Sequence, residues 1–397
     1  MNRDKGPLDG LRVLDFSTLL PGPYATMLLA DMGAEVLRIE SPTRPDILRG
    51  LPPLVGAGEA VSAAHATINR NKKSLALDLK NPGAKEIVRR LLGDYDIVIE
   101  QFRPEVMNKL GFGYKSLCQI RPDIIYCSIT GYGQNGPFKQ RAGHDINYLA
   151  LSGLASYSGR RRSGPSLSGT QIADLAGGSH HAVMAILAAV YQRLQTGNGC
   201  EIDISMTDCA FSLNTLCGAS ALTVGRSPQM EMELLNGGSY YDYYRTADDR
   251  YLAVGSLEPQ FAETLFRRIG HPQWMNRVLE DDQQERLKED IAGVVRKRTL
   301  EEWAEAFADC DACVEPVLSF NEAADSRLMQ ERQMLCTATT SRGEILKQVN
   351  TPFRFEGVKN QQHKAGASLG EHSRSVLQSL GFSSGEIEQI YAQGIIA

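Results

Sequence analysis

The sequence predicts an α/β protein with a large, mainly parallel sheet domain and a smaller α+β domain. In the first 130 residues, short runs rich in branched apolar residues alternate with helical stretches. That alternation is typical of parallel strands whose connecting helices cover the sheet. Near residue 236 a Gly- and Tyr-rich stretch precedes a second group of elements, and 397 residues suit two or three domains.

The large domain is predicted to have a Rossmann-like arrangement of strands and helices. Strands are expected at residues 11–16, 35–39, 74–79, 96–100 and 124–129, with helices at 24–32, 83–92 and 104–110. A long helix is expected over 174–194, because Asp174 suits an N-cap and Gly197 suits a helix end. A strand at 200–205 and a helix at 207–222 follow. No GxGxxG motif follows the first strand, which argues against dinucleotide binding.

The smaller domain begins after the second long helix. The predicted boundaries are 1–220 for the large domain, 221–335 for the smaller one, and 336–397 for a segment that returns to the large domain. Within the last two parts we expect a strand at 251–254 and helices at 260–269, 284–296, 300–307 and 385–393.

Composition excludes several classes of protein. The chain is 42% hydrophobic and 22% charged with a net charge of −5, whereas nucleic-acid binders usually carry a basic excess. The longest apolar run, residues 182–190, is too short for a membrane span, and the start lacks a signal-peptide pattern, so a cytoplasmic protein is expected. The eight cysteines are too sparse for a disulfide scaffold. Cys310 and Cys313 form a CxxC pair without a second pair, so we expect structural cysteines and no metal site.

Cationic residues concentrate in the first 110 positions. The densest cluster is Asn69-Arg70-Asn71-Lys72-Lys73, and several cations follow strand ends, where open α/β sheets bind ligands. Such side chains suit phosphate oxygens. The alternative is a solvated polar loop before a strand, and composition alone favours it.

His144 and Asp174 are the candidate acid/base pair. A histidine and a carboxylate on opposite sides of a carbon acid suffice to remove a proton from one face and return one to the other. Each residue also has an ordinary interpretation, His144 as a loop residue and Asp174 as a helix cap. Backbone N–H groups at the start of that helix, the one of Asp174 included, are expected to hold a developing oxyanion.

Several motifs resemble the family III CoA-transferases over about residues 6 to 330. They are GLRVLD at 10–15, PGP at 21–23, LADMGAEV at 29–36, NKKS at 71–74, LDLK at 77–80 and EQFRP at 100–104. Within that superfamily the chain looks most like the α-methylacyl-CoA racemases. The motifs that carry this resemblance are GYGQ at 131–134, AGHDINY at 142–148, YYD at 240–242 and VGSLEPQF at 254–261.

The resemblance implies residue roles and an assembly. His144 and Asp174 would be the acid/base residues, and Glu258 would orient or charge His144, from the same chain or from a partner. It implies an acyl-CoA substrate, no separate cofactor, and an interlocked homodimer. The residues implied near CoA are Arg38, Arg70, Asn71, Lys72, Lys73, Arg103 and Lys109.

The expected reaction is inversion of the α-carbon of a 2-methylacyl-CoA thioester through an enolate. Transferases of the superfamily keep the aspartate as a nucleophile but typically lack the histidine, so the alternative is CoA transfer through an acyl-aspartyl anhydride at Asp174. A third hypothesis is a CoA-binding protein without catalytic activity. The basic segment 159–165 departs from the family pattern, and it either alters the acyl preference or forms a surface loop.

Overall fold

The computed structural model describes residues 6–56, 61–278, 280–356, 358 and 362–397. The chain divides into two compact units. Unit 1 comprises residues up to 152, residues 169–213 and residues 327–397; unit 2 comprises residues 153–168 and 214–326. The boundaries thus lie near 213 and 326, where we predicted 220 and 335. Residues 153–168 join unit 2 because Arg160 bonds to Asp242 and Glu231.

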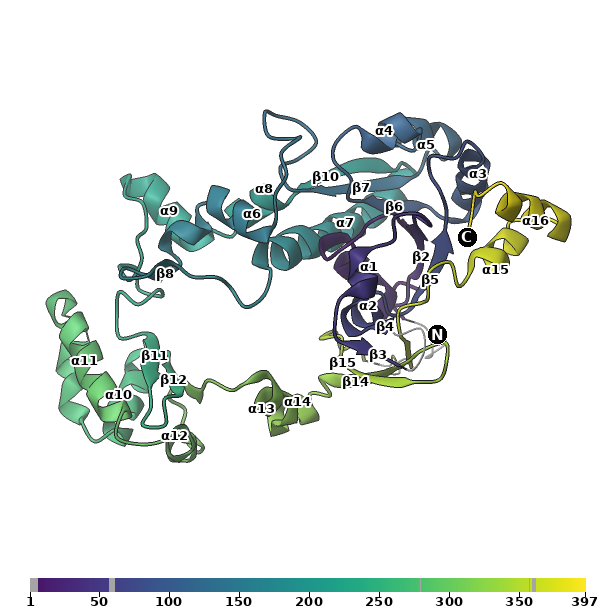
Figure 1. Cartoon of the computed structure of the whole chain (residues 1–397). Helices are drawn as coiled ribbons and strands as arrows, with labels where there is room; N and C mark the ends of the chain where they lie inside the picture. The colour runs from purple at the N-terminus through teal and green to yellow at the C-terminus, as the bar shows by residue number, and fades with distance from the viewer. Residues whose placement is uncertain (1–5, 57–60, 279, 357, 359–361) are drawn as a thin grey trace. The chain divides into compact units, whose positions relative to one another are not determined.

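Unit 1 is built on a six-stranded, wholly parallel sheet with the order β10-β7-β6-β1-β2-β5 (Figure 1). The central strands are short, fully or largely buried and rich in branched residues, as expected of a sheet covered on both faces. The strands are β1 (Arg12–Asp15), β2 (Glu35–Glu40), β5 (Lys72–Ala76), β6 (Ile97–Glu100), β7 (Ile125–Thr130) and β10 (Cys200–Ser205). The prediction of a large parallel sheet is confirmed.

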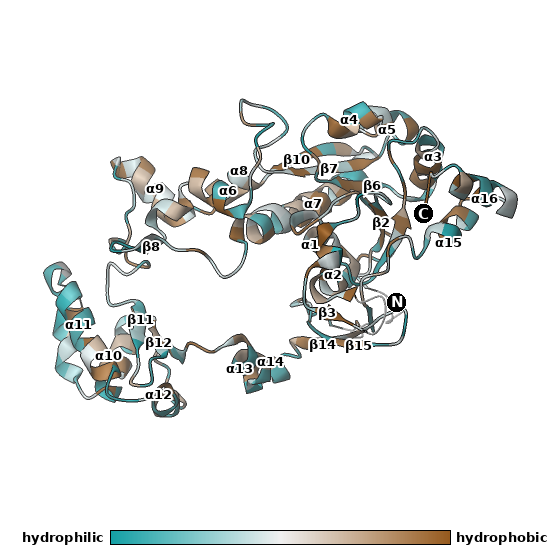
Figure 2. Cartoon of the chain, in the orientation of Figure 1, coloured by the Kyte–Doolittle hydropathy of each residue, from teal (hydrophilic) through white to brown (hydrophobic). Residues whose placement is uncertain are grey.

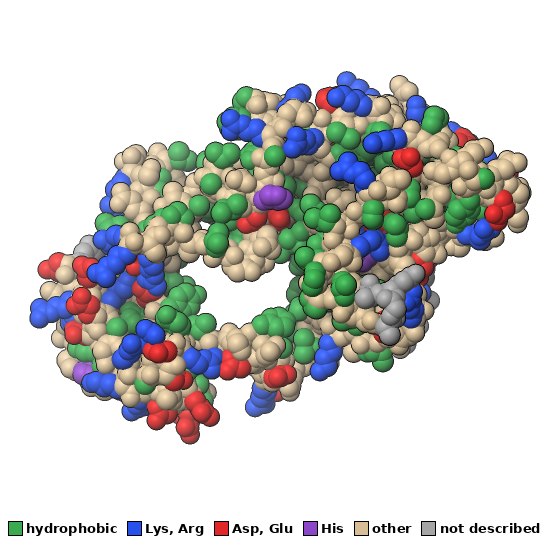
Figure 3. Space-filling model, in the orientation of Figure 1, with side chains coloured by type: hydrophobic (Ala, Val, Ile, Leu, Met, Phe, Trp, Pro, Cys, Tyr) green, Lys and Arg blue, Asp and Glu red, His purple; other side chains and the backbone are tan. Residues whose placement is uncertain are grey.

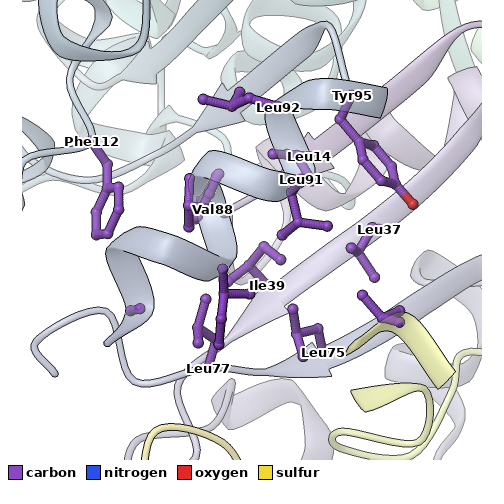
Figure 4. Packing of buried hydrophobic residues seen from close by; sticks show 14 of the residues in the cluster. Leu14, Leu37, Ile39, Leu75, Leu77, Val88, Leu91, Leu92, Tyr95 and Phe112 are labelled. Atoms are coloured by element: carbon purple, nitrogen blue, oxygen red, sulfur yellow. The ribbon is translucent and has the colours of Figure 1, made fainter. Parts of the chain in front are cut away.

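One face of this sheet packs on α3 (Ala84–Asp94) and on the two C-terminal helices, α15 (Ser373–Ser379) and α16 (Ser384–Ala392). Figure 4 shows Leu14, Leu37 and Leu75 of the strands meeting Val88 and Leu91 of α3. Side chains of α15 and α16 belong to the same buried cluster, so the chain end completes the core of unit 1.

The opposite face carries α1 (Pro21–Asp31), the π-helix Ala173–Ser179 and α7 (His180–Thr196). Pro21 begins α1 with a fixed φ that suits a first helical turn. The Ser179 hydroxyl donates to the Pro21 carbonyl at 2.6 Å, which ties the π-helix to the start of α1. Because α1 follows β1, its start lies at the carboxyl edge of the sheet, where ligands bind in open α/β folds.

The remaining elements of unit 1 are short. They are the 3-10 helix Ile47–Gly50, β3 (Leu54–Val55), β4 (Val61–Ser62), α2 (Ala63–Ile68), α4 (Val106–Leu110), α5 (Tyr114–Ile120), α6 (Asp145–Leu151), α8 (Met206–Ser212), α14 (Arg327–Glu331), β14 (Leu335–Thr339), β15 (Ile345–Val349) and β16 (His363–Lys364).

Unit 2 has its own core between a three-stranded sheet and three helices. Trp303, Tyr240 and Phe266 are fully buried there. Its elements are the 3-10 helices Leu154–Tyr157, Pro272–Arg277 and Asp281–Gln283, the strands β8 (Gly159–Arg160), β9 (Gly164–Pro165), β11 (Asp242–Arg245), β12 (Tyr251–Val254) and β13 (Val314–Pro316), and the helices α9 (Thr215–Val224), α10 (Pro259–Arg268), α11 (Gln284–Val295), α12 (Leu300–Phe307) and α13 (Phe320–Asp325).

Two helices differ from their predictions. The expected helix 207–222 is interrupted after Ser212, so α8 and α9 are separate. The expected α-helix from Asp174 begins as a π-helix whose N-cap is Ile172, so the predicted capping role of Asp174 is wrong.

Residues 173–196 form one helical stretch that is long and apolar enough, by length and composition, to cross a membrane. Within unit 1 this stretch packs against α1, α8, β7 and β10. Its outer face carries Met184, Tyr191 and Leu194, which are largely exposed.

Candidate functional site

His144 is the residue immediately before α6, at the carboxyl edge of the sheet of unit 1. Its backbone N–H donates to Oδ1 of Asn147 at 3.0 Å, which closes the first turn of the helix. The hydroxyl of Tyr148 donates to the Gly143 carbonyl at 2.7 Å. These two bonds fix the backbone around His144 while its imidazole stays exposed.

Two glycines allow the aromatic packing beside His144. A Cβ at Gly143 would lie 2.6 Å from Tyr132 Oη and from Tyr148 Cε1, and one at Gly131 would lie 2.5 Å from Tyr148 Cε1. The two tyrosine rings meet edge to face with centroids 5.3 Å apart. The GYGQ and AGHDINY motifs therefore form one packed unit.

Asp174 lies in the first turn of the π-helix, an irregularity often found at functional sites. Its backbone N–H donates to Oδ1 of Asp145 at 3.0 Å, and its carbonyl accepts from the Ser179 hydroxyl at 3.0 Å. We expected that N–H to hold a substrate oxygen. In this structure it is already bonded to Asp145.

The carboxyl group of Asp174 has an unusual proton affinity. Its partial burial disfavours the charged form, the neighbouring Asp145 carboxylate adds to this, and His144 acts in the opposite direction. Together these raise the pKa of Asp174 to about 6. Asp174 can therefore gain or lose a proton near neutral pH, as a general acid or base requires.

His144 and Asp174 line the same cavity of about 860 Å³. Most of its wall is apolar and comes from α1, α2 and the segments beside them. Among the described lining residues the one Lys or Arg is Arg70, and its guanidinium is paired with Asp31 at 2.5 Å. The apolar lining residues are Leu19, Leu20, Pro21, Tyr24, Met27, Leu28, Leu48, Leu51, Ala63, Ala64, Ile68, Leu175, Met206, Val349 and Pro352.

A second cavity, of about 460 Å³, also has His144 in its wall, and its lining is cationic. Arg103, Lys139 and Arg141 line it, and Arg141 stacks on Phe138. Lys and Arg side chains gather over α4, α5 and the loop after β7 (Figure 3). The imidazole of His144 thus stands where an apolar and a cationic cavity meet.

A third cavity, of about 720 Å³, opens beside the ends of β1, β2 and β5. Arg44 and Lys80 line it, together with the apolar side chains of Phe16, Ile39, Leu77, Leu79, Phe102, Val106 and Leu110. Phe102 lies between this cavity and the cationic one.

Three of the predicted CoA-binding cations are buried in internal ion pairs. Arg38 contacts Asp46 at 2.5 Å and Glu40 at 3.5 Å, and Arg70 binds Asp31. Lys72 pairs with Asp15 at 3.4 Å and donates to the Pro23 carbonyl at 2.8 Å, and burial lowers its pKa to about 8. These side chains therefore stabilise unit 1 from within.

The other four predicted residues differ in exposure. Asn71 donates to Asp31, and Lys73 forms an exposed pair with Glu35 at 2.7 Å. Arg103 and Lys109 are exposed, and of the two Arg103 lines the cationic cavity. CoA binding by the seven residues stays a prediction, and for Arg103 the structure brings the side chain beside His144.

Glu258 belongs to unit 2, where it precedes the first residue of α10. Its side chain is exposed, and its charge raises the pKa of Tyr240 in addition to the larger effect of burial. The Tyr240 hydroxyl donates to the Ser256 carbonyl, so the turn that carries Glu258 is anchored to the core of unit 2. Its predicted action on His144 stays a prediction.

The basic segment has internal partners. Arg160 pairs with Asp242 and Glu231, and Arg161 donates to the Glu231 carbonyl at 2.7 Å. Cys310 and Cys313 are free thiols. Among the described residues no three His, Cys, Asp or Glu side chains gather as ligands for a metal.

Sequence reasoning missed several residues beside His144. Lys139, Arg141, Gln101 and Tyr132 line the cationic cavity, and Asp145 contacts Asp174. Lys139 and Arg141 stand five and three positions before His144, and this spacing is the sequence signal that points to them.

Comparison with known proteins identifies the family. Residues 8–373 match the model of CoA-transferase family III. Human α-methylacyl-CoA racemase is 36% identical over 393 residues, which cover 98% of this chain and 97% of that protein. Mouse succinyl-CoA:glutarate CoA-transferase is 31% identical over 98% of this chain and 90% of its own length.

Solved structures agree with this assignment. The crystal structure of a CAIB/BAIF family protein from Brucella suis has a TM-score of 0.84 and 27% identity, over 95% of this chain and all of that one. Rv3272 from Mycobacterium tuberculosis has a TM-score of 0.77 and 27% identity, over 94% and 99% of the two chains. The chain is therefore a member of family III of the CoA-transferases.

Proposed function

We propose that this protein is a racemase that inverts the α-carbon of 2-methylacyl-CoA thioesters. The observation that carries the proposal is that His144 and Asp174 line one cavity. The AGHDINY motif and the similarity to human and mouse α-methylacyl-CoA racemases support it.

The reaction follows from the chemistry of the pair. The thioester carbonyl acidifies the α-proton, because the resulting enolate spreads its charge onto oxygen. One residue, His144 or Asp174, accepts that proton, and the other donates its own proton to the opposite face of the carbon. For Asp174, a pKa of about 6 makes both the protonated and the ionised form accessible near neutral pH.

The two cavities that meet at His144 suggest how a substrate lies. We propose that the acyl chain occupies the apolar cavity, where burial of each methylene contributes about 0.8 kcal/mol. A dicarboxylic acyl group would leave its second carboxylate without a free cation among the described lining residues, since Arg70 is paired with Asp31. An apolar branched acyl group is therefore the preferred substrate class.

The CoA moiety is proposed to lie along the other two cavities. Arg103, Lys139 and Arg141 provide charge-assisted donors for phosphate oxygens beside His144. The adjacent cavity at the ends of β1, β2 and β5 offers the apolar walls that an adenine ring needs. No separate cofactor enters this scheme.

We further propose a homodimer, as the family resemblance implies. Within unit 2, no residue of α9 is buried, although Leu222 and Val224 on this helix are apolar. Figure 2 shows α9 in brown and pale tones and without strongly hydrophilic residues. Exposed apolar patches often mark protein–protein interfaces, and a partner's Glu258 would then be available to His144.

Acceptor-free isotope exchange tests the racemase. A single epimer of a 2-methylacyl-CoA is incubated with the enzyme in D2O, and proton NMR and chiral chromatography follow the α-position. We expect α-deuterium uptake together with formation of the other epimer. Absence of both, across short, long and steroid-like acyl groups, would refute the proposal.

A second candidate, CoA transfer through an anhydride at Asp174, is favoured by the similarity to succinyl-CoA:glutarate transferases. It predicts that CoA moves to an added carboxylic acid and that His144→Ala leaves much of that activity. The racemase predicts that the same substitution abolishes epimerisation, so one variant separates the two functions.

A further inference from the structure

Asp145 connects the two candidate acid/base residues. It follows His144 directly and is the first residue of α6, so its position is fixed by the same helix start. Its carboxylate oxygen Oδ1 accepts the backbone N–H of Asp174 at 3.0 Å. This bond joins α6 to the π-helix, which are remote in sequence but in contact in the fold.

The bond also satisfies a backbone group that would otherwise lack a partner. The first N–H groups of a helix have no acceptor within the helix. The next N–H along the chain, that of Leu175, already donates to the Gln171 carbonyl at 3.0 Å. Loss of the Asp145 oxygen would leave the Asp174 N–H unpaired and free the turn to move. The position of the Asp174 carboxyl in the cavity therefore depends on Asp145.

The second effect of Asp145 is electrostatic. Burial is the largest cause that favours the protonated form of Asp174, and the negative charge of Asp145 is the second. His144 favours the ionised form. Other titratable side chains of the surrounding elements lie on α6, α1, α8 and α7. These are Tyr148 of α6, Tyr24 and Asp31 of α1, Asp208 and Cys209 of α8, and His180, His181, Tyr191 and Arg193 of α7. Among the described residues, the charges that shift the pKa of Asp174 are that of Asp145, which raises it, and that of His144, which lowers it.

We propose that Asp145 is a positioning residue, whose carboxylate holds the Asp174 backbone in place and sets a negative charge beside the Asp174 carboxyl group. This inference rests on the proposed acid/base role of Asp174. It assigns a task to a side chain that need not touch the substrate itself.

The two effects are separable by substitution. Asp145→Asn keeps an oxygen acceptor for the Asp174 N–H but removes the charge, whereas Asp145→Ala removes both. The matched control for loss of one negative charge is Asp94→Asn, because Asp94 is an exposed surface aspartate paired with Arg12.

A direct readout is the pH dependence of esterification of Asp174 by a diazo ester, followed by peptide mass spectrometry, because the protonated acid is the reactive form. Asp145→Asn should move the midpoint of this reaction to lower pH by on the order of one unit. Asp94→Asn should leave it unchanged. An unshifted midpoint in Asp145→Asn would overturn the electrostatic part, whether or not the protein is a racemase.

The catalytic readout tests positioning. Relative to wild type, Asp145→Ala should lose about 10-fold or more of the epimerisation kcat with little change in KM, and Asp145→Asn should recover most of it at its own optimum pH. Equal kcat in Asp145→Ala and wild type would refute the positioning role. Absence of epimerisation in wild type, with a shifted labelling midpoint in Asp145→Asn, would instead refute the proposed function alone.

Discussion

His144 and Asp174 are held in different ways, and the difference bears on their chemistry. The imidazole of His144 is exposed on a backbone fixed by Asn147 and Tyr148. The Asp174 carboxyl is partly buried in a π-helix beside a second carboxylate. Solvent therefore reaches the histidine, whereas the protein sets the proton affinity of the aspartate.

The pH dependence of kcat/KM for one of the two epimers should report the ionisation of Asp174. Its pKa is raised from 3.8 to about 6, so the ionised form that accepts a proton is lost as the pH falls through about 6. For the epimer whose α-proton Asp174 removes, kcat/KM should fall tenfold per unit below that pH. Initial rates from pH 4.5 to 8 measure this. A fall in kcat/KM that begins only near pH 4 would show that Asp174 does not have the partly buried environment described.

Glycine at 143 is required for the packing at His144. Gly143→Ala would place a methyl group 2.6 Å from the Tyr132 hydroxyl and from a ring carbon of Tyr148, so Tyr132, Tyr148 or the backbone must move. We expect a loss of about 1–3 kcal/mol in the free energy of unfolding, and a larger fall in kcat than in stability. Denaturant unfolding and initial rates measure the two effects. The control in the neighbouring loop is Gly136→Ala, whose added Cβ would meet no atom within 4 Å. Its φ of +80° adds backbone strain without a contact at the site.

At the scale of elements, the end of β6 contains a buried carboxyl. Burial raises the pKa of Glu100 to about 7, although Ser128 and the Phe102 N–H bond to it. A raised pKa in the folded state contributes stability that is present below the unfolded value of 4.5 and is lost as the pH rises through 7. Glu100→Gln should therefore stabilise the protein at pH 8, by at most roughly 3 kcal/mol.

Thermal unfolding at two pH values checks this. The difference in Tm between Glu100→Gln and wild type should be large at pH 8 and small at pH 5. A variant that is equally destabilised at both values would show that the Phe102 N–H and Ser128 require the carboxylate.

The parallel strands could be predicted from sequence because their signal is local. Runs such as 96–100 are short, branched and bounded by helical stretches, and β6 appears within one residue of that range. The hairpin of β14 and β15 was not predicted, because its strands lack an apolar face: Leu335, Ile345 and Val349 are exposed, whereas the buried positions hold Ala338 and Gln348.

The site was only partly predictable, because part of its geometry depends on contacts between elements that are distant in sequence. The motif residues His144 and Asp174 could be found, but the bond from Asp174 to Asp145 depends on how α6 meets the π-helix. Likewise, Arg38, Arg70 and Lys72 resemble ligand cations in sequence, and only the fold reveals their internal carboxylate partners.

At the scale of the whole molecule, the exposed apolar residues of α9 predict association. Leu222 is 85% exposed, so Leu222→Asp should weaken a dimer by placing a charge in its interface. Light scattering should then give the mass of one chain at concentrations where wild type gives that of two. Lys297→Asp, at an exposed position on unit 2, is the control. A wild-type protein of single-chain mass would contradict the proposed assembly.

The central claim is that His144 and Asp174 act on opposite faces of one carbon. The most direct test incubates each pure epimer of a 2-methylacyl-CoA in D2O with His144→Ala and with Asp174→Asn, and follows α-deuterium by NMR. We predict that neither variant interconverts the epimers, and that each still exchanges one epimer, a different one in each variant. Exchange of the same epimer by both variants, or epimerisation by either, would contradict the account.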